Sequence, residues 1–485
     1  MIHRRVSLYF FIAAICFFTF PELAPLSNAQ EQTAPQSTID NSKEPSKRSL
    51  ADLKRDLETA ENLKGSEHPD LVPVLQSIAK ARREVGAYVP ALESVRRAQA
   101  IADKTPGEDE LTIAGNLDLM GTLELSAGDS GSALKHYEQA WAILQKKVAF
   151  DNPANAMMQT RTGAALLELG KLPEAESALE KSLGRTTEMY GLASEEVIPI
   201  ELLLGEVYLR EGKYSRAEQQ LASALAARSD SVSIQVAAGK ITHADAEIML
   251  SPIRNLLGAL YTVAGAWDDA GPLLVDALKA YEVKLGPNDE SLEKVLVNLA
   301  ALARARGNAG SAAEYQKRAA QIHAATIGFA HLPGVPLPEA VRAPAITANA
   351  PYTGTHVGDW VAYQGLEGSL PEKKEVTRKT STALWLQTSE WDRKAKRWQP
   401  GDEGLVGLTE DLQLPRQNPN GPATEEKVEI QGRPVDTACR KVADSPLAKE
   451  CRVCEAPGIV PLGGFVKLEC DGRVLYQAVA FGNGK

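Results

Sequence analysis

The sequence of 485 residues lacks the motifs that mark the common enzyme families. It has no phosphate-binding glycine loop, no His-Glu-x-x-His pair and no Gly-x-Ser-x-Gly elbow. Its seven histidines are scattered and show no metal-ligand spacing. We therefore expect a protein that is not an enzyme, with no catalytic residues, no cofactor and no metal site.

The chain also lacks an excess of positive charge. The chain has 53 basic and 63 acidic residues, a net charge of −10, and no block of five or more like charges. Nucleic acids and anionic membrane surfaces are bound by basic patches. The charge balance predicts that neither is a partner.

Long hydrophobic runs are nearly absent as well. The one such run, residues 6–20, follows a basic start at His3, Arg4 and Arg5 and precedes the small-residue motif Ser27-Asn28-Ala29. At 15 residues it is short for a spanning helix, which needs about 20. We expect residues 1–29 to be a signal peptide, although an uncleaved anchor is the alternative. The protein is then exported (periplasmic, cell-envelope or secreted), with no membrane span after signal removal.

Two stretches show no hydrophobic periodicity and divide the rest of the chain. Residues 30–49 are polar, contain two prolines and are expected to be a disordered linker. Residues 331–351 are rich in proline and alanine, a composition that favours an extended spacer. A repeat region at 50–330 and a different domain at 352–485 remain.

Glycines recur through the repeat region with gaps of 42, 42, 42, 53 and 42 residues. These marker glycines are Gly86, Gly128, Gly170, Gly212, Gly265 and Gly307. An alanine stands five residues after each marker, and a small residue stands twelve after it. Small side chains at fixed offsets let helices approach closely, so the spacing predicts a stack of helical hairpins. The longer gap, at about residues 229–250, predicts a lengthened connection or an added helical turn.

Several units resemble the tetratricopeptide repeat family. The matching residues in one unit are Leu204, Gly205, Tyr208, Gly212, Ala217, Leu221 and Ala224, and those of the next unit are Leu257, Gly258, Tyr261, Gly265, Ala270, Leu274 and Ala277. The period of 42 residues exceeds the family's usual one of about 34 and is similar to that of the kinesin-light-chain type. Residues 65–70 and 285–290 resemble the linkers of that type.

The resemblance implies a right-handed superhelix whose first helices line a concave groove for a protein or peptide. The side chains that it places near this groove are Gln76, Lys80, Arg83, Asp118, Thr122, Thr160, Leu202, Glu206, Asn255, Asn298 and Arg304. An asparagine amide offers both a donor and an acceptor, so it can pair with the backbone of an extended peptide. The alternative is that these positions are merely solvated.

The C-terminal region has candidate strands bounded by turn residues. They lie at 358–363, 375–388, 425–430, 435–442, 450–455, 464–469 and 473–481. This spacing predicts an antiparallel sheet curled into a half-barrel or a sandwich. The predicted fold is thus α+β and multidomain: a right-handed α-solenoid of tetratricopeptide-type helical hairpins, followed by a small antiparallel β domain.

Four cysteines lie in the C-terminal region: Cys439, Cys451, Cys454 and Cys470. In an exported chain they favour two disulfides. Neighbouring hairpins would set Cys439 opposite Cys451 and Cys454 opposite Cys470. A four-thiolate zinc site and free or redox-active thiols are the alternatives.

Two functions fit these patterns. The first is an exported, non-catalytic scaffold or adaptor that binds a protein or an extended peptide in the solenoid groove. The second is a β domain that holds a hydrophobic or lipid-like small molecule, with the repeats as a recruiting arm. An apolar cavity inside the sheet domain would favour the second function. The sequence specifies no oligomeric state.

Overall fold

The computed structural model describes residues 49–105, 109–149, 152–346, 350–365, 369–392, 394–408, 410, 419–442 and 451–483. The predicted signal peptide and nearly all of the linker predicted at 30–49 lie outside these residues. The chain forms two compact units. The first comprises the residues up to Val207, Gln219–Ala259 and Trp267–Ala340; the second comprises Tyr208–Glu218, Leu260–Ala266 and the residues from Val341 onward.

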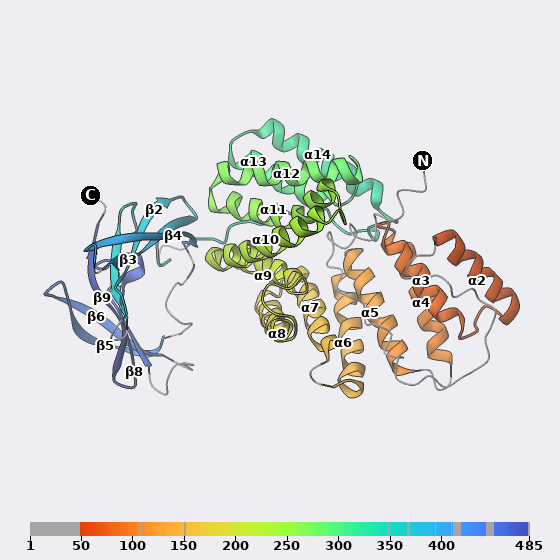
Figure 1. Cartoon of the computed structure of the whole chain (residues 1–485), viewed down its shortest axis with the longest axis horizontal. Coiled ribbons are helices and arrows are strands. Elements are labelled where there is room, and N and C mark those ends of the chain that lie inside the picture. Colours follow the sequence, from red (N-terminus) through yellow and green to blue (C-terminus); the bar gives the residue numbers. More distant parts are fainter. Residues whose placement is uncertain are drawn as a thin grey trace. The chain divides into compact units, whose positions relative to one another are not determined.

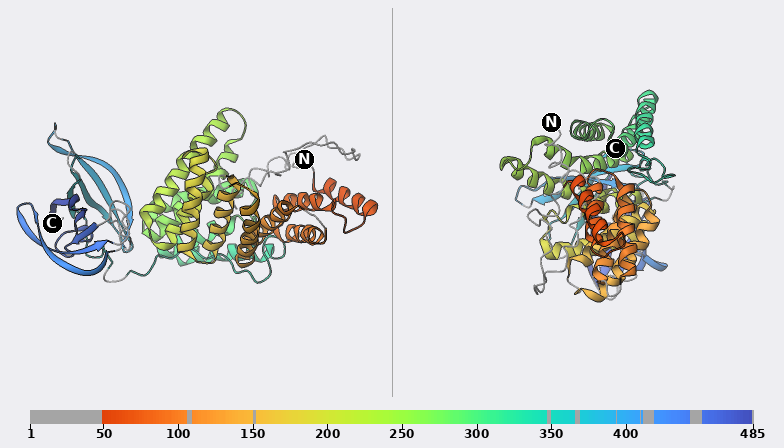
Figure 2. Two further views of the ribbon diagram at one scale, coloured as in Figure 1. Left: turned by 90° about the horizontal axis from the view of Figure 1, so that it is seen from below. Right: turned by 90° about the vertical axis from the view of Figure 1, so that its right-hand side faces the viewer.

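The described part of the repeat region is helical from Leu50 to Thr326 (Figure 1). Its helices are α2 (Leu50–Lys64), α3 (Leu71–Arg83), α4 (Tyr88–Lys104), α5 (Glu110–Ser126), α6 (Ser130–Lys147), α7 (Pro153–Glu168), α8 (Leu172–Tyr190), α9 (Ile198–Glu211), α10 (Tyr214–Ala237), α11 (His243–Ala264), α12 (Trp267–Leu285), α13 (Leu292–Ala305) and α14 (Ala309–Thr326). After α2 they pair as hairpins, from α3–α4 to α13–α14, which follow one another along the stack (Figure 2). The predicted α-solenoid is confirmed.

Each hairpin turns at its marker glycine. All six glycines have positive φ angles, from 71° at Gly86 to 92° at Gly128. L-residues with a Cβ atom adopt this conformation at a steric cost, whereas glycine does not. The repeated glycine therefore ends each first helix and lets the second helix fold back.

The small residues lie where the two helices of a hairpin cross. The alanine five residues after each marker is no more than 5% exposed. Seven residues before the marker, four hairpins have a glycine, and a Cβ atom there would lie 2.6–2.7 Å from a large side chain of the second helix. These pairs are Gly121 with Tyr137, Gly163 with Leu179, Gly205 with Leu221 and Gly258 with Leu274. The close approach predicted from the spacing is confirmed.

The extra residues of the longest repeat extend helices. Helix α10 has 24 residues and α11 has 22, with a short turn between them. Thr242 and Asp245 cap the start of α11, because the Asp245 amide donates to Thr242 Oγ1 (3.2 Å) and the Thr242 amide donates to Asp245 Oδ2 (2.8 Å). The predicted added helical turn is present.

After α14 the chain runs back along the solenoid. In this return segment, residues 327–335, the carbonyl of Phe329 accepts from the Val89 amide and the Leu332 amide donates to Ala127, both at 3.0 Å. Ala330 is fully buried in a cluster with residues of α4 and α5. The return segment therefore packs against the first two hairpins, α3–α4 and α5–α6.

The second unit contains a nine-stranded antiparallel sheet within its described residues. The strands are β1 (Trp360–Gln364), β2 (Glu372–Lys379), β3 (Ala383–Asp392), β4 (Arg397–Gly407), β5 (Pro419–Ile430), β6 (Arg433–Val442), β7 (Cys451–Glu455), β8 (Phe465–Cys470) and β9 (Arg473–Gly482). Their order is β4-β3-β2-β1-β9-β8-β7-β6-β5. Strands β1–β4 form one meander and β5–β9 another, and the pairing of β1 with β9 joins the two. Apolar side chains from both meanders form one cluster, and the sheet curls around it as the predicted half-barrel would.

The strand predictions need two corrections. The segment predicted at 375–388 is a hairpin of β2 and β3, whose turn is held by a hydrogen bond from the Ala383 amide to Thr380 Oγ1 (3.1 Å). This turn contains neither glycine nor proline, so the sequence did not signal it. Strand β4 was not predicted, because Pro400, Gly401 and Gly404 weaken its strand pattern.

Both disulfides are present, but the predicted pairing is wrong. The bonds join Cys439 to Cys454 and Cys451 to Cys470. Strand β7 lies between β6 and β8, so Cys454 faces Cys439 on one neighbour while Cys451 faces Cys470 on the other. Because Cys451 and Cys454 are three positions apart, they point to opposite faces of the sheet. The four thiols are thus bonded in pairs and do not form a zinc site.

Candidate partner-binding surface

All the groove residues predicted from the sequence lie on first helices. They are Gln76, Lys80 and Arg83 on α3, Asp118 and Thr122 on α5, Thr160 on α7, Leu202 and Glu206 on α9, Asn255 on α11, and Asn298 and Arg304 on α13. The starts of α5 and α7 are fixed by capping side chains. Asp109 accepts from the Leu111 amide (3.2 Å), and Asn152 accepts from the Ala154 amide (2.9 Å) ahead of Pro153.

Asp118 belongs to a charged link between two first helices. Its carboxylate pairs with Arg161 of α7, and Arg161 Nη1 also donates to Thr122 Oγ1 at 2.8 Å. Asp118 is 6% exposed and Arg161 is 4% exposed. The pair therefore holds α5 and α7 in register and offers little charge to a partner.

The two predicted asparagines also contact each other. Asn298 Nδ2 donates to Asn255 Oδ1 at 2.9 Å, and both residues are less than a tenth exposed. Each amide therefore satisfies part of the other's hydrogen-bonding capacity. This bond links α11 to α13 as the Asp118–Arg161 pair links α5 to α7.

Two further candidates are internal. Thr160 is buried, with Oγ1 2.6 Å from Ser182 Oγ and 3.1 Å from the Ala156 carbonyl, and Leu202 is also buried. Arg304 is exposed. The half-buried candidates are Gln76, Lys80, Arg83, Thr122 and Glu206.

The sequence did not single out three polar residues of this surface: Asn116, Gln159 and Arg161. Gln76 Nε2 donates to Asn116 Oδ1 at 2.6 Å, which links α3 to α5. Within the described residues, Asn116 Nδ2 and Gln159 Oε1 are buried and form no hydrogen bond. A hydrogen bond from a partner to such an unsatisfied atom would therefore stabilise the complex. The signal was a spacing of 43 residues, one more than the period, by which Arg161 follows Asp118 just as Asn298 follows Asn255.

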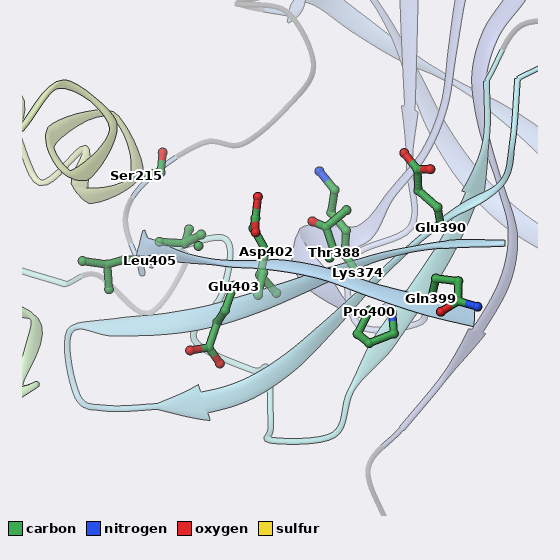
Figure 3. Close-up of a pocket in the computed structure, with 13 residues that line it drawn as sticks. Ser215, Lys374, Thr388, Glu390, Gln399, Pro400, Asp402, Glu403 and Leu405 are labelled. Carbon is green, nitrogen blue, oxygen red and sulfur yellow. The ribbon is translucent and has the colours of Figure 1, made fainter. Parts of the chain in front are cut away.

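The sheet unit has a hollow of about 580 Å³ (Figure 3). Polar side chains line part of it, namely Lys374, Thr388, Glu390, Gln399, Asp402 and Glu403, and apolar ones line the rest, namely Leu386, Pro400, Leu405 and Val406. Two of these apolar residues, Leu386 and Val406, also belong to the core cluster of the sheet. The lining of this hollow is therefore mixed, with polar and apolar side chains side by side.

No helix in the described part of the chain is both long and apolar enough to cross a membrane.

Comparison with known proteins identifies the repeats. The family model described as tetratricopeptide repeat matches residues 155–230 and 249–325. Among solved structures, the chain is similar to BtubC (BKLC) from P. vanneervenii, at 24% identity over 49% of this chain and 92% of that one, with a TM-score of 0.38. It is also similar to nearly identical TPR-like repeats of a Podosopora anserina protein named for kinesin light chain, at 18% identity over 44% of this chain and 97% of that one, with a TM-score of 0.31.

A third similar structure is the Rap conjugation gene regulator of the plasmid pLS20, which was solved in complex with the Phr* peptide. Its identity is 14% over 61% of this chain and 82% of that one, with a TM-score of 0.38. A comparison with curated protein sequences gave no match. The family match, the stacked hairpins and the small residues buried where helices cross show that the chain contains tetratricopeptide repeats.

Proposed function

We propose that the chain is an exported, non-catalytic scaffold whose repeats bind a protein or an extended peptide along the first helices. The observation that carries the proposal is a row of polar side chains that recurs on successive first helices. Its members contact one another between α3 and α5, between α5 and α7, and between α11 and α13.

The contacts within the row support a preorganised surface. Gln76–Asn116, Asp118–Arg161 and Asn255–Asn298 are each a link from one first helix to the next. A surface whose side chains are already fixed loses less conformational entropy when a partner binds. The row therefore suits recognition of an extended chain that crosses several repeats.

The charges of the row indicate the chemistry of the partner. Lys80 and Arg83 lie half-buried on α3, and Arg304 is exposed on α13. Side-chain and backbone acceptors can pair with such donors. We infer a partner segment that carries carboxylates near α3 and presents its backbone to the half-buried Gln76 amide of α3.

Export is the other part of the proposal, and the basic, apolar and small-residue regions of residues 1–29 support it. N-terminal sequencing of the protein purified from its native cells tests it. A mature chain that begins at Gln30 is the expected result. Recovery of an intact N-terminus from the cytoplasm would contradict export.

Binding is tested with the immobilised full chain and a library of random peptides. Selected peptides should be acidic and should bind at least tenfold more weakly to Gln76→Ala/Lys80→Ala, a loss of about 1.4 kcal/mol. Gln139→Ala, an exposed glutamine on the second helix α6, is the matched control and should leave the affinity unchanged. Equal affinities of the double variant and the wild type would contradict a site on the first helices.

A further inference from the structure

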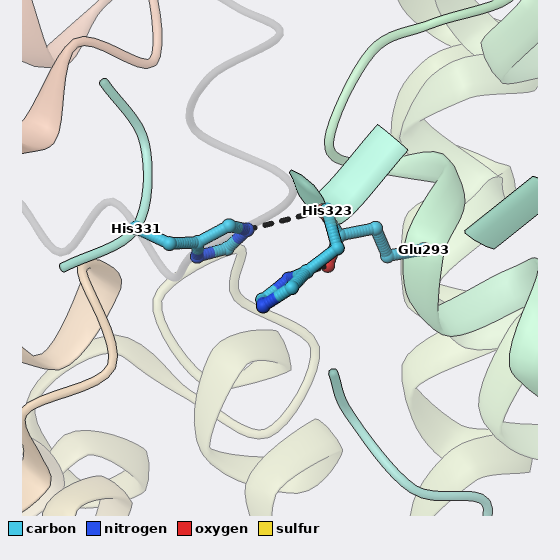
Figure 4. A group of neighbouring side chains, drawn as sticks. All are labelled: Glu293, His323 and His331. Atoms are coloured by element: carbon cyan, nitrogen blue, oxygen red, sulfur yellow. Dashed lines mark hydrogen bonds and ion pairs between the residues drawn. The ribbon is translucent and has the colours of Figure 1, made fainter. Parts of the chain in front are cut away.

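Three potential metal ligands from three elements meet in the helical unit. They are Glu293 of α13, His323 of α14 and His331 of the return segment (Figure 4). His323 Nδ1 lies 3.0 Å from Glu293 Oε2, and His331 Nε2 lies 3.1 Å from Glu293 Oε1. All three residues are less than a tenth exposed. The three side chains therefore form a buried cluster in the interior of the helical region.

The hydrogen bonds of His323 show that a cation belongs in the cluster. Its Nε2 atom lies 2.9 Å from the carbonyl oxygen of Val335, which can only accept, so Nε2 carries a hydrogen. In a neutral ring Nδ1 then has a lone pair, and this lone pair faces a carboxylate oxygen of Glu293. Two acceptors at 3.0 Å repel each other unless a proton or a metal ion lies between them.

The donor atoms suit a metal ion. All lie within 4.8 Å of one another. In a tetrahedral zinc site with bonds of about 2.0–2.1 Å, neighbouring ligand atoms are about 3.3 Å apart. The nitrogen–oxygen separations of 3.0 and 3.1 Å need only small shifts to reach that value. Two imidazoles and one carboxylate are a donor set that zinc accepts.

The surroundings of His323 match those of a metal ligand. A metal-bound histidine usually donates its other ring N–H to a carbonyl or a carboxylate, which fixes the ring and its tautomer. The bond from His323 Nε2 to Val335 does this and leaves Nδ1 directed at the cluster. On this basis, we propose that Glu293, His323 and His331 bind one divalent first-row metal ion, Zn²⁺ in the first instance, with water as a fourth ligand.

The position of the site indicates a structural role. The ion would tie the return segment to the last hairpin, and the same segment is hydrogen-bonded to Val89 and Ala127 of the first two hairpins. An ion that binds only the folded state stabilises it by mass action. The other cluster of potential ligands in the described residues, Glu426 with Cys439 and Cys454, offers no thiolate because its cysteines form a disulfide.

The test is a titration of the untagged, metal-free full chain with Zn²⁺ alone, followed by calorimetry. One ion per chain should bind, and the melting temperature of the helical unit should rise by several degrees. Co²⁺ in place of Zn²⁺ should give visible d–d absorption without a thiolate charge-transfer band, because the ligands are nitrogen and oxygen.

His331→Ala and Glu293→Gln should each weaken Zn²⁺ binding at least 100-fold. His136→Ala is the matched control and should bind Zn²⁺ as the wild type does. His136 Nδ1 also lies 2.6 Å from a buried glutamate, Glu124, but within the described residues this pair belongs to no group of three potential ligands. Absence of saturable binding by the folded wild type would overturn the proposal and leave a proton as the cation. Unchanged binding by His331→Ala, or a thiolate band with Co²⁺, would overturn it too. The wild-type titration and the Co²⁺ spectrum decide the matter even if a variant fails to fold.

Discussion

At the scale of single residues, the Asp118–Arg161 pair belongs to the candidate surface and also stabilises the solenoid. Both side chains are buried, so removal of one leaves the other charge without its main partner in a medium of low dielectric. We predict that Asp118→Ala lowers the free energy of unfolding by about 3–5 kcal/mol. Urea denaturation followed by circular dichroism measures this change.

The control for that variant is Asp52→Ala, which removes half of an exposed pair with Arg55. Exposed pairs contribute about 0–1 kcal/mol, so this change should be small. A replacement of both buried partners, Asp118→Leu with Arg161→Met, should cost less than Asp118→Ala because no unpaired charge remains. Equal effects of Asp118→Ala and Asp52→Ala would show that the buried pair is not a structural link.

Glu290 makes stability depend on pH. Burial, together with the nearby Asp289 carboxylate, raises the pKa of Glu290 from 4.5 to about 8. The unfolded chain loses this proton near pH 4.5 and the folded chain near pH 8, so this group lowers stability as the pH rises between those values. Glu290→Gln remains neutral and should raise the melting temperature more at pH 8 than at pH 5. Glu138→Gln, at an exposed position of α6, should show no such difference.

At the scale of elements, the glycine in the middle of a first helix sets how closely a hairpin can pack. A Cβ atom on Gly163 of α7 would lie 2.6 Å from Leu179 Cγ of α8. Gly163→Ala should therefore overpack the hairpin and cost about 1–3 kcal/mol.

Gly184 of α8 provides the matched control, because a Cβ atom there meets nothing within 4 Å. Alanine at this exposed helical position should instead stabilise by about 0.4–1 kcal/mol. Thermal denaturation of both variants tests the pair of predictions. A stabilising Gly163→Ala would mean that the helices do not cross at this residue.

The disulfide pairing can be checked with one protease. Trypsin cleaves after Arg452 and so separates Cys451 from Cys454. Without reduction, residues 428–440 should remain linked to 453–467, and residues 450–452 to 468–473. Mass spectrometry identifies these pairs. A link between 428–440 and 450–452 would instead support the pairing that we expected from the sequence.

These elements show what the sequence could and could not predict. The hairpins were predictable because glycine at positive φ and alanine at a helix crossing are local requirements that recur in phase. The disulfide pairing was not, because β7 pairs with β6 and β8 at once and a hairpin rule considers one neighbour at a time. Glu293 and His331 are 38 residues apart, so no local motif joins them. Likewise, the partners of Asp118 and Asn255 depend on how successive repeats stack.

At the scale of the helical unit as a whole, the return segment joins the last hairpin to the first two. Glu293 and Ala330 show the two halves of this connection: one contacts His323 and His331, and the other is buried beside α4 and α5. A solenoid usually has contacts only between neighbouring repeats, and it can open from its ends. The return segment adds contacts between repeats that are far apart in sequence, which should make opening more cooperative.

Ala330→Asp tests this coupling. A carboxylate at this fully buried position has no partner in the apolar cluster, so the return segment should detach rather than bury it. We predict faster hydrogen exchange at the amides of Val89 and Leu332, which lose their hydrogen bonds to Phe329 and Ala127. Phe329→Asp is the control, because its side chain is 46% exposed and its hydrogen bonds to Val89 and Thr326 come from the backbone. Slow exchange at Val89 in Ala330→Asp would contradict this coupling. It would mean that the first hairpin is stable without the return segment.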